Sequence, residues 1–283
     1  MKSLDCEICG GPVADLRLAP GCTLDRCTAC GHLARDLTRA PARHRDLAYG
    51  GEPTLDRIRL DLTYRAMRRY AEPRSVFEIG YGSGSMLRRF LDGGATVAGA
   101  DPDQLQIGVD EKVRREGTLH EGPVESLDPA GVDADLVYGI HVLEHVADPV
   151  RTMRVARDLL APGGMVQFLT PAGDSDGIQL YRDGWWMLED PTHVRFFTAA
   201  SLARAAEDAG LIRVRVLRPV LDSLVTDAAS VARRLSPRDR PRGVLSSRAV
   251  LGAGLASAPV VLGARLARPR LRPTLHLVAE RPR

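Results

Sequence analysis

A glycine-rich turn between an apolar strand and a helix constrains the fold of this chain most. Residues 75–79 read Ser-Val-Phe-Glu-Ile, and Gly80, Gly82 and Gly84 follow at two-residue spacing. Glycines at such a turn let the backbone bend sharply and bring the following helix close to a bound ligand. The segment therefore predicts an α/β fold that binds a ligand where this strand ends.

Two acids indicate what kind of ligand the turn would hold. The glycines follow G-x-G-x-G after Glu78, whereas dinucleotide-binding folds favour G-x-G-x-x-G, which suits a pyrophosphate. A carboxylate at the turn suits a cationic amino-acid tail better than a phosphate. Asp101 ends the next apolar strand, at residues 96–100, at the distance where an acid accepts ribose hydroxyls. The pattern predicts a nucleoside ligand with an amino-acid tail.

All five cysteines fall within the first thirty residues. Cys6 with Cys9 and Cys27 with Cys30 form two CxxC pairs separated by 17 residues, a spacing typical of a four-cysteine zinc site. Four thiolates close a tetrahedral shell, so we expect a structural Zn²⁺ in a small ribbon. A redox CxxC pair and reduced structural cysteines are the alternatives. Cys22 would be a spare thiol, and the nearby His32 a neighbour, not a ligand.

Composition bounds the architecture and the partners. The 283 residues suffice for one main core plus a small module, and the formal net charge of +3 gives little reason to expect a nucleic-acid partner. The first ten residues lack the pattern of a secretory signal, so we expect a cytoplasmic protein. The sequence does not indicate an oligomeric state.

With these motifs in order, residues 72–220 and a last strand near 274–280 resemble class I S-adenosylmethionine-dependent methyltransferases of the ubiquinone-type and metabolite or sugar branch. The resemblance implies a Rossmann-like α/β fold, with a mostly parallel seven-stranded sheet and helices on both faces, preceded by the zinc ribbon. It also implies S-adenosyl-L-methionine as the cofactor.

The same resemblance assigns the cofactor contacts. Residues 122–127 are similar to the adenine loop of the family, but Pro123 stands where an acid is frequent, so this contact would fall to Glu125 or to the backbone of Val124. The full set of expected cofactor-binding residues is Glu78, Gly80, Tyr81, Gly82, Gly84, Asp101, Pro102, Val124, Glu125 and His141.

Methyl transfer to a hydroxyl requires a base and an acceptor pocket. His193, His145 and His141 are the candidate catalytic bases. The expected substrate-binding residues are Trp185, Trp186, His193 and Arg195. Alternatively, Trp185 belongs to the core and His193 only caps a helix.

The segment 141–145 has two further interpretations. It matches H-x-x-E-H, the pattern of one class of zinc peptidase, because two histidines four residues apart share one face of a helix. Alternatively, Glu144 and His145 hold a divalent ion.

We expect four parts: a zinc ribbon at 1–35, a linker and capping helix at 36–72, the cofactor-binding core at 73–220, and a helical insertion with the last strand at 221–283. In the last part, residues 249–264 carry no charge and are short for a membrane span, which favours a buried or interfacial helix. Twelve arginines from Arg233 onward, against Asp239 and Glu280, would suit weak contact with an anionic lipid surface. A solvated arginine face is the alternative.

The expected activity is methyl transfer to a small-molecule acceptor, with a hydroxyl of a sugar-like or secondary metabolite favoured. One alternative is an RNA methyltransferase that grips its substrate with the ribbon and the basic tail. The other is a catalytically silent zinc-ribbon binding module.

Overall fold

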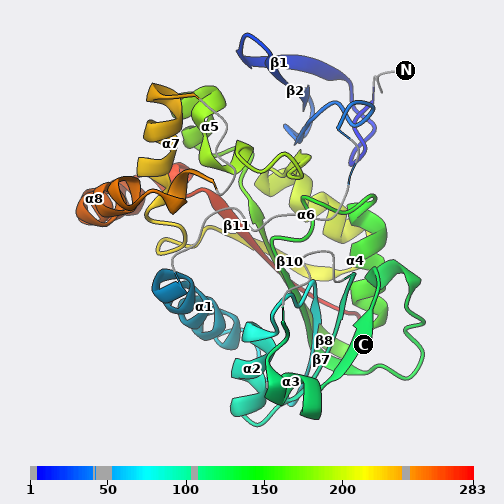
Figure 1. Cartoon of the computed structure of the whole chain (residues 1–283). Coiled ribbons are helices and arrows are strands. Elements are labelled where there is room, and N and C mark those ends of the chain that lie inside the picture. The colour runs from blue at the N-terminus through cyan, green and yellow to red at the C-terminus, as the bar shows by residue number, and fades with distance from the viewer. Residues whose placement is uncertain (1–4, 41, 43–52, 103–107, 238–242) are drawn as a thin grey trace.

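A seven-stranded sheet forms the centre of the computed structural model, which describes residues 5–40, 42, 53–102, 108–237 and 243–283 (Figure 1). Its strand order is β10-β11-β8-β7-β4-β5-β6. Only β11 runs antiparallel to its neighbours within this sheet. The predicted mostly parallel seven-stranded sheet is therefore confirmed. The strands are β4 (Ser75–Ile79), β5 (Thr96–Asp101), β6 (Thr118–Glu121), β7 (Ala134–Ile140), β8 (Leu160–Pro171), β10 (Ile212–Leu217) and β11 (Thr274–Glu280).

Alternation along the strands buries both faces of this sheet. Phe77 of β4 packs in a cluster with α4 and α6, whereas its neighbour Val76 packs in a second cluster with α1, α2 and α3. Helices therefore cover both faces. They are α1 (Pro53–Arg68), α2 (Ser85–Asp92), α3 (Glu111–Glu116), α4 (Pro149–Asp158) and α6 (Ala199–Asp208).

The glycine-rich turn joins β4 to α2 as expected. Gly80 has φ 74°, and a Cβ atom there would lie 2.8 Å from Cγ2 of Val142. Gly84, with φ 71°, directly precedes α2. Both positions therefore need glycine, because other residues rarely adopt this conformation and Gly80 also has no room for a side chain.

The N-terminal module builds its sheet with help from the core. Its strands β1 (Val13–Ala19), β2 (Cys22–Cys27) and β3 (Leu33–Ala34) pair in order, and β3 also pairs with β9 (Arg195–Phe196) of the core. The module's own segment ends near residue 35, but its sheet includes two residues from far along the chain. Residues 43–52 of the expected linker lie outside the described residues.

An ion pair between the buried Arg195 and the partly exposed Glu7 ties the module to the core. Glu7 lies between two cysteines of the first pair, and both of its carboxylate oxygens accept hydrogen bonds from Arg195, at 2.7 and 2.8 Å. The Arg195 side chain is 1% exposed and also donates to the carbonyls of Val146 and Ala147. Burial alone would raise the pKa of Glu7, but hydrogen bonds from His32 and Arg195 lower it to about 2. Glu7 is therefore charged and fixed at neutral pH.

The last part of the chain is helical before it returns to the sheet. Helices α5 (Asp176–Tyr181), α7 (Thr226–Leu235) and α8 (Arg248–Ala267) gather at one end of the molecule (Figure 1). Only Gly254 and Arg265 of α8 are buried, so of the two expected alternatives the buried helix is wrong and the interfacial helix stays a prediction. By length and composition alone, α8 could cross a membrane.

Removal of the Glu7 carboxylate should destabilise the protein strongly. Glu7→Ala leaves the Arg195 guanidinium buried without its counter-charge, a change that typically costs about 3–5 kcal/mol. Urea unfolding of zinc-loaded protein measures the effect. The control is Glu72→Ala, which removes an exposed carboxylate 3.8 Å from Arg68 and should change stability by less than about 0.5 kcal/mol. Equal unfolding midpoints for Glu7→Ala and the parent, with zinc content unchanged in both, would contradict a stabilising role of the Glu7–Arg195 ion pair.

Candidate functional site

Seven of the ten expected cofactor-binding residues line one cavity at the carboxyl ends of β4, β5 and β7. This cavity, the cofactor cavity, has a volume of about 110 Å³. Parallel α/β sheets bind ligands at this edge. The seven residues are Gly80, Gly82, Asp101, Pro102, Val124, Glu125 and His141. Their role as ligands of a cofactor stays a prediction.

Asp101 stands where the ribose-binding acid is expected. Its Oδ2 accepts a hydrogen bond of 2.9 Å from the backbone N–H of Gly82. The carboxylate is thus fixed beside the glycine-rich turn. Glu125 also lines the cavity, and its Oε1 accepts a hydrogen bond from the hydroxyl of Thr152 on α4.

Three expected cofactor-binding residues are not among the described residues that line the cavity. They are Glu78, Tyr81 and Gly84, and they support the glycine-rich turn. The buried Glu78 carboxylate accepts a 3.0 Å hydrogen bond from the Tyr138 hydroxyl, and burial raises its pKa well above the usual range. The expected contact of Glu78 with the cofactor stays a prediction. Tyr81 packs in the core cluster, and Gly84 leads into α2.

A second cavity of about 420 Å³, the acceptor cavity, lies beside the first. Helices α1 and α8, the turn around Trp186 and the segment 221–226 enclose it. Its apolar lining is Leu55, Ile58, Leu62, Ile140, Trp186, Met187, Leu221, Leu224, Val225, Leu245, Leu251, Leu255 and Ala258. The polar lining is Asp56, Arg59, His141, Glu189, Asp190, His193, Ser223 and Thr226.

The two cavities meet at the end of β7. Ile140 and His141 line both of them. His141 has φ 56°, a left-handed conformation that is uncommon outside glycine. Strain of this kind is concentrated at functional sites, where the surrounding structure holds it in place.

Glu144 organises three histidines around this junction. Its fully buried carboxylate pairs with Nδ1 of His141 at 2.9 Å and accepts a 3.1 Å hydrogen bond from the Thr170 hydroxyl. Burial alone would raise the pKa of Glu144, but the His141 hydrogen bond and the nearby histidines lower it to about 2. Glu144 is therefore an anion, and it attracts positive charge that forms on a neighbouring imidazole.

His193 is placed to act as a base. Its Nδ1 lies 2.8 Å from the carbonyl oxygen of Met187, which can only accept, so Nδ1 carries the proton and Nε2 presents a lone pair. Burial lowers the pKa of His193, which keeps the ring neutral at pH 7. Nε2 lies 3.9 Å from Glu144 and 3.8 Å from Asp190.

His145 is the neighbouring candidate and faces the cofactor side. It lines the cofactor cavity, and its Nδ1 lies 3.0 Å from the carbonyl oxygen of Thr192. The rings of His145 and His193 are 4.8 Å apart between centroids. Because His193 lines the acceptor cavity and His145 does not, His193 is the better placed base.

Trp185 and Arg195 are corrected as acceptor ligands, because neither is among the described residues that line the acceptor cavity. Trp185 is buried against Phe196, with ring centroids 5.5 Å apart. The Arg195 guanidinium is paired with the Glu7 carboxylate. Trp186 and His193 do line the cavity.

The sequence did not indicate Arg35, which fixes the loop that carries His193. Its guanidinium donates to the carbonyls of His193, Leu188 and Asp190 at 2.9, 3.0 and 3.3 Å. Its backbone N–H also donates to Val194, at 2.8 Å. A lone arginine at the end of a zinc ribbon carries no local signal for such a role.

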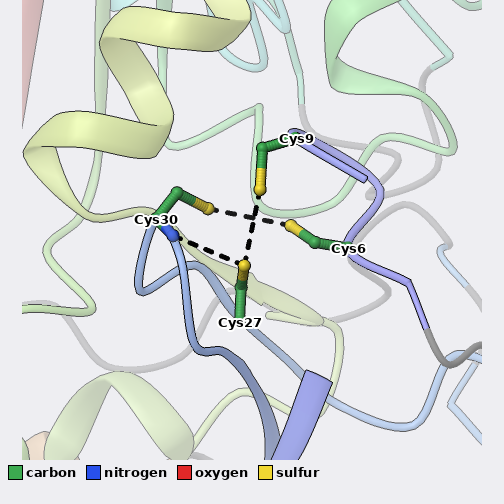
Figure 2. A group of neighbouring side chains, drawn as sticks. All are labelled: Cys6, Cys9, Cys27 and Cys30. Atoms are coloured by element: carbon green, nitrogen blue, oxygen red, sulfur yellow. Dashed lines mark hydrogen bonds between the residues drawn. The ribbon is translucent and has the colours of Figure 1, made fainter. Parts of the chain in front are cut away.

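The four predicted zinc ligands converge (Figure 2). Their sulfur atoms all lie within 4.8 Å of one another, with Cys6 to Cys30 at 3.8 Å and Cys9 to Cys27 at 3.4 Å. Tetrahedral Zn–S bonds of about 2.3 Å place sulfur atoms about 3.8 Å apart. The backbone N–H groups of Ile8 and Cys30 point at two of the sulfurs, at 3.4 Å each. The residues therefore fit a Zn²⁺ ion.

The other interpretations of residues 141–145 fare differently. The segment forms turns and no helix, so His141 and His145 do not share a helical face and the peptidase alternative loses its basis. Ligand atoms of Glu144, His145 and His193 lie within 4.8 Å of one another, so the divalent-ion alternative stays open with His193 added.

Comparisons with known proteins agree with this geometry. Residues 43–215 match a family model described as a methyltransferase domain. A ubiquinone biosynthesis O-methyltransferase of Dinoroseobacter shibae is 36% identical over 95 residues, 32% of this chain and 38% of the relative. A tRNA U34 carboxymethyltransferase of Klebsiella pneumoniae is 29% identical over 190 residues, 60% of this chain and 55% of the relative. The chain thus spans about half or less of these curated relatives.

A solved structure shares the fold. Phosphoethanolamine N-methyltransferase 2 of Haemonchus contortus, in complex with S-adenosyl-L-methionine, superposes with a TM-score of 0.54 at 14% identity. The match covers 78% of this chain and 53% of that one. At this identity the likeness concerns the fold alone.

One zinc ion per chain is expected, and the fifth cysteine supplies a matched control. Cys9→Ser should remove most of the bound metal, because serine is a poor zinc ligand and three thiolates leave the shell open. Cys22→Ser should keep it, since Cys22 packs with an apolar cluster outside the four-sulfur group. Elemental analysis of the purified proteins measures the zinc bound per chain. Equal zinc in both variants would exclude a four-cysteine site.

Proposed function

Because the chain belongs to this methyltransferase-domain family, we propose that it transfers a methyl group from S-adenosyl-L-methionine to a hydroxyl of a small-molecule acceptor. The single observation that carries the proposal is the junction of two cavities at Ile140 and His141, with His193 in the wall of the larger one. A cofactor in one cavity and an acceptor in the other would meet there.

The residues that line the cofactor cavity support the choice of this cofactor. Asp101 would accept the ribose hydroxyls, and Val124 with Glu125 would border the adenine. When bound, S-adenosyl-L-methionine supplies a methyl group on a sulfonium centre. The residues of the chain hold acceptor and methyl donor in line, and such positioning provides much of the rate of a two-reactant step.

His193 acts as the general base. As the acceptor oxygen attacks the methyl carbon, Nε2 of His193 takes the hydroxyl proton, and the carbon–sulfur bond breaks with its electron pair left on sulfur. The imidazolium formed lies near Glu144 and Asp190, which stabilise its charge. His141 positions the junction through its bond to Glu144.

The acceptor cavity favours a molecule with an apolar body. Leucine, isoleucine and valine side chains with Trp186 make up most of its lining, and Asp190 lies beside His193. A free sugar would leave its hydroxyls against apolar walls, at a cost for each unpaired group. Within the expected acceptors, a secondary metabolite such as a phenol is therefore favoured over a sugar. The same apolar walls argue against RNA as the acceptor.

The cytoplasmic location stays a prediction.

The zinc ion would act only on structure in this proposal. Four thiolates leave no open position for an acceptor. The module instead supplies Arg35, which holds the loop of His193. No contact in the described site favours the alternative that the protein is a catalytically silent zinc-ribbon binding module.

Asp101→Ala should weaken binding of S-adenosylhomocysteine by about 1–3 kcal/mol, or roughly 5- to 150-fold, through the loss of charge-assisted hydrogen bonds. Isothermal calorimetry measures the affinity. Asp133→Ala is the matched control, because this exposed aspartate precedes β7 at the opposite edge of the sheet. An unchanged affinity in Asp101→Ala would remove Asp101 from the ribose site.

His193→Gln should lower kcat for methyl transfer to a phenol by about 10²- to 10⁴-fold, the usual contribution of a general base, and leave S-adenosylhomocysteine affinity unchanged. Tritium transfer to the best phenol of a small panel provides the assay. In the parent, kcat/KM should fall as pH drops below a pKa under 6.5, since burial lowers the pKa of His193 and protonation removes the base. A parent-like kcat and pH profile in the variant would refute this role.

A further inference from the structure

Helix α8 has the composition of a buried helix but lies on the surface. From 249 to 264 it contains no charged residue, and only Gly254 and Arg265 of its twenty residues are buried. A surface helix of a globular protein normally turns charged or polar side chains to water. The outer face of α8 instead carries alanine, glycine, proline and three large apolar side chains, Leu255, Val260 and Leu266.

Neighbouring helices also carry exposed apolar side chains. Val260 is 75% exposed and Leu266 is 60% exposed, while Leu235 on α7 is 80% exposed and Leu180 on α5 is 61% exposed. These three helices gather at one end of the molecule (Figure 1). Large exposed apolar side chains on helices at one end of the molecule favour an interaction site there.

Arginines bracket the apolar helix. Arg248 opens α8 and Arg268 follows its last residue, and both are exposed. Residues 233–283 contain twelve arginines and two acids, and Arg238, Asp239, Arg240 and Arg242 lie outside the described residues. Acids of other segments pair with Arg233, Arg234, Arg265 and Arg270, so Arg248 and Arg268 are the cations that flank the apolar face. A second copy of the chain on this surface would bring like charges together, whereas an anionic surface would complement them.

Buried contacts keep α8 attached to the body. The guanidinium of Arg265 is 1% exposed, pairs with Asp227 on α7 at 2.6 Å and donates to the carbonyls of Asp222 and Ser223. At Gly254, a Cβ atom would lie 2.9 Å from Cβ of Val225. These contacts favour a helix that lies along a surface over one that leaves the protein to span a bilayer.

We propose that α8 docks the protein on the surface of an anionic lipid bilayer. The outer apolar face enters the interface between headgroups and acyl chains, and the flanking arginines meet anionic headgroups. Leu255 of α8 and Ile58 of α1 both line the acceptor cavity and are about half exposed, so the mouth of the cavity adjoins the docking surface. An acceptor with an apolar tail would pass from the bilayer to His193.

Vesicle flotation with the full zinc-loaded chain tests the docking. The protein should float with vesicles of phosphatidylcholine and phosphatidylglycerol and should bind phosphatidylcholine alone weakly. The double variant Val260→Asp with Leu266→Asp should lower binding by roughly tenfold or more, because it places charge in the apolar interface. Arg248→Gln and Arg268→Gln should each lower binding about fivefold, and added salt should weaken the parent. Ile212→Asp is the control, since Ile212 is a partly exposed apolar residue on β10 and should bind like the parent.

Three results would overturn the proposal: no flotation of the parent with anionic vesicles, parent-like flotation of the double aspartate variant, or a dimer by light scattering that this variant converts to a monomer. Circular dichroism on the same samples shows that each variant is folded. Calorimetry with S-adenosylhomocysteine separates the two proposals, because flotation of folded protein without cofactor binding would refute methyl transfer and leave membrane docking intact.

Discussion

The pairing of Arg195 with Glu7 is the contact on which the rest of the site depends. Glu7 is positioned by the cysteines on either side of it, and Arg195 begins the core strand that completes the module's sheet. Two residues before Arg195 stands His193, whose carbonyl is held by Arg35 of the module. Through these contacts the N-terminal module fixes the loop that carries His193, although the cysteines of the module line neither cavity.

The parallel sheet then brings the other half of the site to the same place. Because β4, β5 and β7 end at one edge, the glycine-rich turn, Asp101 and His141 meet there without being close in sequence. Glu144 links this edge to the loop held by the module, since its carboxylate lies beside both His141 and His193. The buried Glu144 carboxylate gives the junction its electrostatic character.

Local sequence patterns were enough to predict most of the fold and half of the candidate site. The glycine turn, Asp101 and the cysteine pairs have fixed spacing within short segments, and each lies where that spacing predicts. Arg195 and Trp185 were misplaced, because an arginine or tryptophan beside a histidine looks like a ligand until its distant partner is known: Glu7 is 188 residues away in sequence. The walls contributed by α1 and α8 were missed for the same reason. Composition did reveal α8 as a helix, but only packing shows that its apolar face is exposed.

The central claim is that a methyl donor and an acceptor meet between two cavities at Ile140 and His141. Calorimetric titration of the zinc-loaded protein with S-adenosyl-L-methionine, and separately with NADH, tests it most directly. The account predicts one site per chain with micromolar affinity for S-adenosyl-L-methionine, on the order of 8 kcal/mol, and no heat with NADH. No binding of S-adenosyl-L-methionine, or binding of NADH alone, would contradict it.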